Sequence, residues 1–161
     1  AAPLSIGRTT VVRAAAFAPG MLPTLTATRS YFFVEDIVRQ PDNPDGYPVG
    51  NVWTPTPANI QNGSRAYYQM DPKIVDDPQY ADTVRAGLLS IPTMSIASAI
   101  DGLFGDVNGI YSHPQSRGPA WERACSMELM FPDGSDGTQV DCGLQIQGGT
   151  QREPETGRQK E

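Results

Sequence analysis

The strongest constraint on the fold is a pair of alternating segments that flank a glycine-rich turn. In "CSMELMF" (Cys125–Phe131), Met127, Leu129 and Phe131 fall on one face. The following "PDGSDG" contains two Asp-Gly pairs, which are typical of tight hairpin turns. In "TQVDCGLQIQGG", apolar residues again alternate with polar ones. The sequence therefore predicts an antiparallel hairpin here.

A second pair of strands is predicted near the N-terminus. "TTVVRAAAF" (Thr9–Phe17) is β-branched at its start, and "APG" (Ala18–Gly20) is a turn signal. Its three alanines are also compatible with a helix, which the turn would cut short. "LTATRSYFFVEDIV" then resumes the alternation. Two strands alone are marginal in water, so we expect them to pack on later segments of the chain or to have sheet partners upstream of residue 1.

The middle of the chain predicts an irregular connector and then short helices and a strand. Gln40–Gly63 is rich in proline and has no sustained period, although its Tyr47 and Trp53 could anchor it to a neighbouring surface. Asp-Pro pairs predict a short turn near 72–76 and a helix over 78–89 that ends before Pro92. "PTMSIAS" predicts a strand, and "AIDGLFGDVNGIY" a short helical turn with a loop. Together these segments predict an α+β, β-rich fold.

Charge and hydropathy exclude several classes of protein. The net charge is −6 and the pI is about 4.7, which argues against a nucleic-acid partner. No run of 18 apolar residues occurs, so we expect no membrane-spanning segment. The first residues have neither a basic nor an apolar stretch of the kind found in a signal peptide. We interpret the abrupt start as a sign that the chain is a piece of a longer protein.

Few residues suggest chemistry on their own. Cys125 and Cys142 are compatible with a bridge across the hairpin and equally with two thiols. The single histidine, His113, lies in a loop beside a proline and is interpreted as a surface residue. The sequence contains no C-x-x-C, H-E-x-x-H or complete phosphate-binding glycine pattern.

Two acidic loops have some of the character of calcium sites. "DVNG" starts like an EF-hand loop at Asp106, but position 12 of that loop is Arg117 instead of glutamate. Asp133 and Asp136 suit a hairpin turn without a metal. We therefore expect no metal site and no cofactor in this chain.

The tripeptide "WER" (Trp121–Arg123) is the densest group of functional-looking residues. Trp121 could cover the edge of a core while Glu122 and Arg123 form a surface ion pair, which would contribute about 0–1 kcal/mol. The alternative is a binding role beside a groove.

Several strings together resemble known families. "TTVVRAAAFAPGMLPTLTATRSYFF" resembles the last strands of the chitobiase/β-hexosaminidase C-terminal-like module, also called fibronectin-III-associated. "IPTMSI", "LFG…GIY", "G-x-x-WER", "S-M-E-L", "PDGS" and "G-L-Q-I-Q-GG" resemble, in order and spacing, the N-terminal part of the CotH kinase-like family. The resemblance covers about residues 8–33 and 88–149.

The resemblance implies a secreted or cell-surface multi-module protein, often bacterial, whose CotH part is similar to an atypical serine kinase that would use ATP and a divalent metal. Such a kinase needs a lysine and acidic residues that lie beyond the "GLQIQGG" strand in the family. Members usually carry a basic residue where Gln145 and Gln147 stand, and continue into a lysine-containing strand that "TQREPETGRQKE" lacks. We therefore assign no catalytic residue.

The resulting expectation is a fragment with three parts: 1–36 as the last strands of an Ig-like β-sandwich module, 37–77 as a connector, and 78–161 as the N-terminal part of a CotH-like domain. The family residues of unknown role are Trp121, Glu122, Arg123, Gly148 and Gly149. The alternative function is a non-catalytic adhesion, spacer or carbohydrate-associated binding module. Its partners would be a protein or a cell-surface polymer. We also expect a marginal fold with mobile ends at 1–10 and 150–161.

Overall fold

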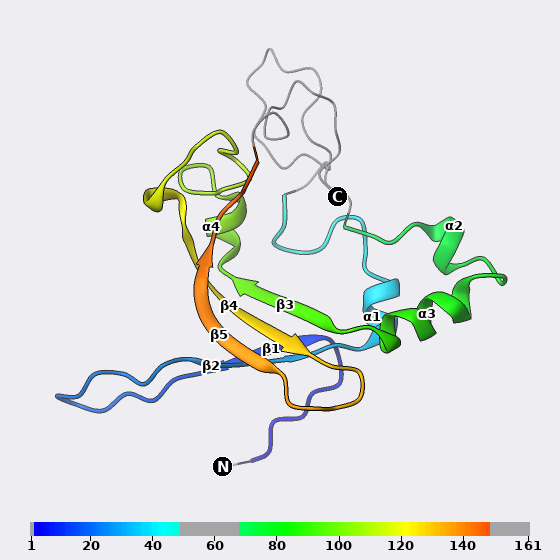
Figure 1. Cartoon of the computed structure of the whole chain (residues 1–161), viewed down its shortest axis with the longest axis horizontal. Coiled ribbons are helices and arrows are strands. Elements are labelled where there is room, and N and C mark those ends of the chain that lie inside the picture. Colours follow the sequence, from blue (N-terminus) through cyan, green and yellow to red (C-terminus); the bar gives the residue numbers. More distant parts are fainter. Residues whose placement is uncertain (1, 49–67, 149–161) are drawn as a thin grey trace. The chain divides into compact units, whose positions relative to one another are not determined.

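The protein combines short helices with two small sheets, in a strand-rich α+β arrangement. The computed structural model describes residues 2–48 and 68–148. Within these residues the chain runs through the elements labelled in Figure 1. The strands are β1 (Thr10–Ala14), β2 (Ala27–Tyr31), β3 (Thr93–Ser98), β4 (Arg123–Met130) and β5 (Thr138–Leu144). The helices are α1 (Val34–Val38), α2 (Pro72–Val75), α3 (Ala81–Ser90), α4 (Ile100–Phe104) and a 3-10 turn, η1 (Pro119–Trp121).

Interleaved segments of the chain form two compact units. Unit 1 consists of Ala1–Arg39, Met70–Ala97 and Ser126–Cys142. Unit 2 consists of Gln40–Gln69, Ser98–Cys125 and Gly143–Glu161. The part boundaries expected from the sequence, after residues 36 and 77, stay predictions.

The N-terminal hairpin forms as the sequence predicted, although its first strand is shorter than Thr9–Phe17. β1 pairs antiparallel with β2, from Thr10 opposite Tyr31 to Ala14 opposite Ala27. In the turn, the Met21 N–H donates to the Ala18 carbonyl at 3.2 Å. Gly20 adopts a φ of 72°, a conformation that favours glycine. The "APG" signal is therefore confirmed.

The second strand ends earlier than its alternating pattern suggested, because "VEDIV" is helix α1. Val38 is buried and Val34 and Ile37 are half-buried, which is the spacing of a helix face. The side chain of Thr9 accepts a hydrogen bond from the Phe33 N–H at 3.0 Å, and this contact holds the chain at the point where the helix begins. The prediction that the strand pattern continues past Phe33 was wrong. In so short a segment, tertiary contacts determine whether a helix or a strand forms.

The Asp-Pro pairs mark helix starts, as expected. The Asp71 carboxylate accepts from the Lys73 N–H at 2.9 Å and caps α2, whose first residue is Pro72. The Asp77 carboxylate accepts from the Gln79 N–H at 2.8 Å in the turn that leads into α3. That helix therefore begins three residues later than predicted, and it ends at Ser90, before Pro92.

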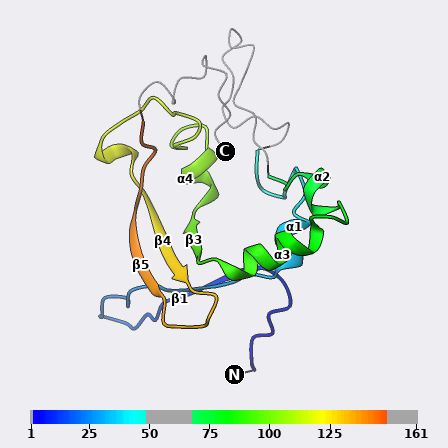
Figure 2. The same ribbon diagram turned by 45° about the vertical axis from the view of Figure 1, so that its right-hand side comes forward.

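Arg85 of α3 joins the helices of unit 1, which lie side by side in Figure 2. Its Nε donates to the Glu35 carboxylate of α1 at 2.6 Å, and its Nη1 to the Val75 carbonyl of α2 at 3.4 Å. The bond from Arg85 holds the pKa of Glu35 below its usual value. Val38 and Val75, each 3% exposed, are the buried hydrophobic residues of these helices.

The predicted C-terminal hairpin is also present. The second sheet has the order β3-β4-β5, with β4 in the middle (Figures 1 and 2). A side chain at Gly137, just before β5, would collide with the Leu129 carbonyl, so the turn needs glycine there. "AIDGLF" supplies the predicted short helix, α4.

Within unit 1, the buried face of strands β3 and β4 is polar. On β3, Ser95 is 6% exposed, whereas Met94 and Ile96 on the other face are 59% and 49% exposed. On β4, Ser126 and Glu128 are buried. Alternation thus located these strands, but it did not show which face lies inward.

Hydrogen bonds explain why this polar face can be buried. The Glu128 carboxylate, 5% exposed, accepts from the Ser30 N–H at 2.7 Å and from Arg29 Nη1 at 3.2 Å. The Ser30 and Ser95 hydroxyls lie 2.7 Å apart. We call the hydrogen-bonded residues Ser30, Ser95 and Glu128 the polar seam. It links β2 to β3 and β4 within unit 1.

The connector is described only in part. Residues 40–48 carry no helix or strand, as expected, and Tyr47 contacts Tyr68 and Phe104 with ring centroids 5.4 and 5.9 Å apart. Residues 49–67 of the predicted connector, including Trp53, lie outside the described residues, as do Gly149 and the C-terminal tail, while residues 68–77 contain helix α2. Cys125 is buried and Cys142 is exposed.

Candidate functional site

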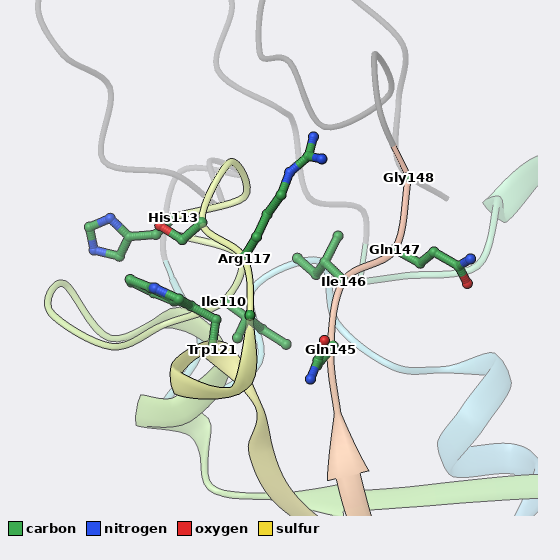
Figure 3. A pocket seen from close by; sticks show the side chains of 10 residues that line it. Ile110, His113, Arg117, Trp121, Gln145, Ile146, Gln147 and Gly148 are labelled. Atoms are coloured by element: carbon green, nitrogen blue, oxygen red, sulfur yellow. The ribbon is translucent and has the colours of Figure 1, made fainter.

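Unit 2 contains an open pocket of about 260 Å³ that carries two of the family residues, Trp121 and Gly148. One wall is the loop between α4 and β4, and the other is the chain that continues past β5 (Figure 3). The lining residues are Ile110, His113, Ser116, Arg117, Gly118, Trp121, Gln145, Ile146, Gln147 and Gly148.

Tight backbone packing after α4 fixes the first wall. The Ile110 N–H donates to the Gly102 carbonyl at 3.1 Å, and the Gly109 N–H to the Gly105 carbonyl at 2.8 Å. A side chain at Gly109 would collide with the backbone of Gly105, so this turn requires glycine. Ile110 is consequently held at 3% exposure in the pocket lining.

Arg123, the last residue of the Trp121–Arg123 motif, stabilises the same loop through hydrogen bonds. Its Nε donates to the Asn108 carbonyl at 2.7 Å and its Nη1 to the Ala120 carbonyl at 2.9 Å. Its guanidinium carbon also lies 5.2 Å from the centroid of the Trp121 ring, within cation–π range. Arg123 therefore positions Trp121 and the loop.

Glu122 connects the two walls. Its carboxylate accepts from Gln145 Nε2 at 2.9 Å, and its side chain lies so close to Gly143 that a Cβ there would collide with it. The surface ion pair between Glu122 and Arg123 that the sequence suggested is not formed within the described residues. Each charge binds a different part of the wall instead.

His113 is part of the pocket lining and is half-buried, and the hydrogen bond of its ring is exposed, so its interpretation as a residue of a surface loop stays a prediction. Its Nε2 lies 2.6 Å from the Asp106 carbonyl, which can only accept, so this nitrogen carries the proton. The imidazole also contacts Trp121, with ring centroids 5.1 Å apart. His113 therefore packs against the Trp121 ring and helps to fix its position.

Arg117 is the one charged side chain in the lining. It is exposed and extends beside the pocket in Figure 3, with no hydrogen bond or ion pair in the part of the chain that the structure describes. Ile146, half-buried, is directed from the opposite wall toward the loop, whereas Gln147 is directed away from it (Figure 3). Gly148 ends this wall with a φ of 125°.

No family model, curated protein or solved structure matches this chain. The CotH-like and chitobiase-like resemblances therefore rest on the quoted sequence strings alone. In the residues that the structure describes, no helix is long and apolar enough to cross a membrane.

The acidic loops are not arranged around a common point. Across residues 2–48 and 68–148, no group of three or more His, Cys, Asp or Glu side chains is placed to hold a metal ion. Asp133 accepts from the Ser135 N–H at 3.0 Å, and hydrogen bonding from Ser135 holds the pKa of this aspartate below its usual value. Asp133 therefore acts as a turn residue, as expected.

The arrangement favours binding of a ligand with an anionic group and an apolar face. Arg117 offers a forked set of donors that matches a carboxylate, while the half-buried Ile146 and Trp121 offer apolar surface. Sequence reasoning identified Trp121 and Gly148 but missed Ile110, Ile146 and the role of Arg117. In the sequence, Arg117 was considered only as a residue that does not fit position 12 of a calcium loop. The pocket itself was not predicted, because its residues come from two distant segments that meet only in the folded chain.

Proposed function

We propose that this chain is part of a secreted or cell-surface CotH-like protein, and that its pocket binds a carboxylate-bearing segment of a cell-surface polymer. The observation that carries the proposal is Arg117, a cation without a protein partner in the described residues, in a lining that also holds the half-buried apolar side chains of Trp121 and Ile146. Among the alternatives raised by the sequence, this is the carbohydrate-associated binding module.

The chemistry of the lining supports a uronic-acid sugar as the ligand. An arginine binds a carboxylate through two parallel charge-assisted hydrogen bonds, and a neutral sugar has no charged acceptor for them. The faces of a sugar ring are rich in C–H groups, so the apolar side chains of Trp121 and Ile146, one on each wall of the pocket, suit them. An open pocket admits one or two residues of a polymer that continues on either side.

Calorimetric titration with a short oligouronate tests this function. We expect Arg117→Gln to weaken binding about tenfold or more, the loss expected for a charge-assisted hydrogen bond of roughly 1.5–3 kcal/mol. Arg117→Lys should retain part of the affinity. Arg8→Gln, an exposed arginine in unit 1, is the matched control and should bind like the parent. Equal affinity for the uncharged reduced oligosaccharide, or unchanged affinity of Arg117→Gln, would refute the proposal.

For the CotH-like resemblance, we propose that the parent protein is an atypical kinase and that this chain alone transfers no phosphate. The support is limited to the motif strings, none of which assigns a catalytic role to a residue here. Incubation with radiolabelled ATP, a divalent metal and a serine-containing acceptor should leave the acceptor unlabelled. Phosphate transfer that is lost on removal of residues 148–161 would overturn this.

The Ig-like character of residues 1–36 is likewise proposed from the resemblance. The antiparallel pairing of β1 with β2 is consistent with the end of a β-sandwich module. Backbone structure determination of the full-length parent would test it, since a second sheet packed on this hairpin is required.

A further inference from the structure

The hairpin of unit 1 ends in an exposed apolar tip. The chain between β1 and β2, residues 15–26, extends beyond the paired strands (Figure 1), and we call it the hairpin tip. Four of its large apolar side chains are almost fully exposed: Phe17 (81%), Met21 (74%), Leu22 (93%) and Leu25 (89%). Contiguous exposed apolar side chains of this kind mark an interaction site.

Hydrogen bonds join the two sides of the tip at its base and restrict its conformations. The Thr24 N–H donates to the Ala16 carbonyl at 3.1 Å, and the Ala16 N–H donates to the Thr24 hydroxyl at 2.9 Å. Beyond this pair, Gly20 forms the turn with its positive φ, and a proline stands on its N-terminal side. A rigid loop loses little freedom when it binds.

The residues of the hairpin themselves carry only positive charge. From residue 2 to Val34 the sequence contains Arg8, Arg13 and Arg29 and no Asp or Glu, although the whole chain has a net charge of −6. Arg29 is paired with the Glu128 carboxylate of β4 at 3.2 Å, so Arg13 is the arginine that is placed to bind a partner. Arg13 is exposed and lies three residues before Ala16, or about 10 Å at the rise of a strand. The hairpin therefore has an apolar tip and a positively charged residue, Arg13, next to it, whereas the whole protein carries a net negative charge.

We propose that the hairpin tip inserts into an anionic lipid surface. Phe17, Met21, Leu22 and Leu25 enter the boundary between headgroups and acyl chains, and Arg13 binds the lipid phosphates. Interfacial segments reach roughly 5–10 Å into this boundary and gain affinity from apolar area together with basic residues. The acidic remainder of the chain is repelled by the same surface, which favours contact through the tip.

A second copy of this chain fits the tip less well. A symmetric contact through two tips would offer Arg13 no acidic partner from the other hairpin, because residues 2–34 contain no Asp or Glu. A bilayer instead supplies anionic groups at the base of the tip and hydrocarbon at its end.

Vesicle co-sedimentation of the full chain tests the proposal. We expect binding to phosphatidylglycerol vesicles to exceed binding to phosphatidylcholine vesicles and to fall with added salt. Leu22→Ser and Phe17→Ser should each lower the partition coefficient about tenfold, since each removes an exposed apolar side chain that the bilayer would bury on binding. Arg13→Gln should lower it about fivefold and weaken the salt dependence. Leu89→Ser, at a leucine of α3 that is 64% exposed, is the matched control and should bind like the parent.

Three results would overturn the proposal. They are equal binding to both kinds of vesicle, unchanged binding of Leu22→Ser, and self-association that Leu22→Ser abolishes while no vesicle binding is seen. Circular dichroism of each variant establishes that it is folded, which is expected because the substituted side chains are exposed. The vesicles contain no sugar, so the outcome is independent of ligand binding in the unit 2 pocket.

Discussion

Replacement of Glu128 should separate the two halves of its interaction in the polar seam. The carboxylate is 5% exposed and accepts from the buried Ser30 N–H at 2.7 Å, as well as from Arg29 at 3.2 Å. The arginine side chain is 67% exposed, so solvent screens that arm of the interaction. The hydrogen bond from the Ser30 backbone should therefore account for most of the stabilisation.

The magnitudes differ enough to be measured. Glu128→Ala leaves the Ser30 N–H buried without an acceptor and removes a bond to a charged group, so we expect a loss of about 2–4 kcal/mol in the free energy of unfolding. Arg29→Gln should cost less than about 1 kcal/mol, as exposed ion pairs do. Glu128→Gln keeps an acceptor oxygen and should fall between the two.

Urea denaturation followed by circular dichroism measures these changes, with m-values compared to confirm a common transition. A double-mutant cycle between positions 29 and 128 should give a coupling below about 1 kcal/mol. Equal losses for Glu128→Ala and Arg29→Gln would refute the reasoning, because they would place the stabilisation in the exposed ion pair.

Three further predictions concern single contacts. Thr28, 1% exposed, has no hydrogen-bond partner for its hydroxyl in the described chain, so Thr28→Val should stabilise the protein by about 1 kcal/mol in the same urea assay; a loss would contradict this. The hydrogen bond from Arg85 lowers the pKa of Glu35. The stabilisation of the folded state by this ion pair is therefore present above the ordinary glutamate pKa and is lost as the pH falls through the lowered value. The melting temperatures of the parent and Glu35→Gln should converge between about pH 5 and pH 3 and not on the alkaline side. Gly143→Ala should weaken oligouronate binding because it displaces Glu122, and the effect should vanish in a Glu122→Ala background, whereas an equal loss in both backgrounds would show that the strand itself is perturbed.

The sequence located most of the elements because short-range chemistry determines them. The turn at Ala18–Gly20, the Asp71 cap and the Asp-Gly pairs before β5 each act within a few residues, so their effects can be read locally. The helix α1 was missed because five residues carry too little pattern to distinguish a helix from a strand. Contacts with Thr9, 24 residues away, decide its start.

The inward face of the strands could not be predicted from hydrophobicity. Alternation places Met94 and Ile96 together, but the buried face of β3 carries Ser95 because the Ser30 hydroxyl provides its partner. Which face of β3 is buried thus depends on a residue 65 positions away in the sequence.

The site was predicted only in part for the same reason. Trp121 was found from its motif, whereas Arg117 and Ile146 lie on segments that meet only in the folded unit 2. Glu122 and Arg123 looked like a local pair, but each binds a different wall.

The most direct test of the central claim is a titration of the isotope-labelled chain with a short oligouronate, followed by amide NMR. Binding in the pocket should shift the amides of residues 110–118 and 145–148 and the Trp121 indole N–H, and these shifts should disappear in Arg117→Gln. Shifts confined to the β1–β2 hairpin, or no shifts at millimolar oligouronate, would contradict the account.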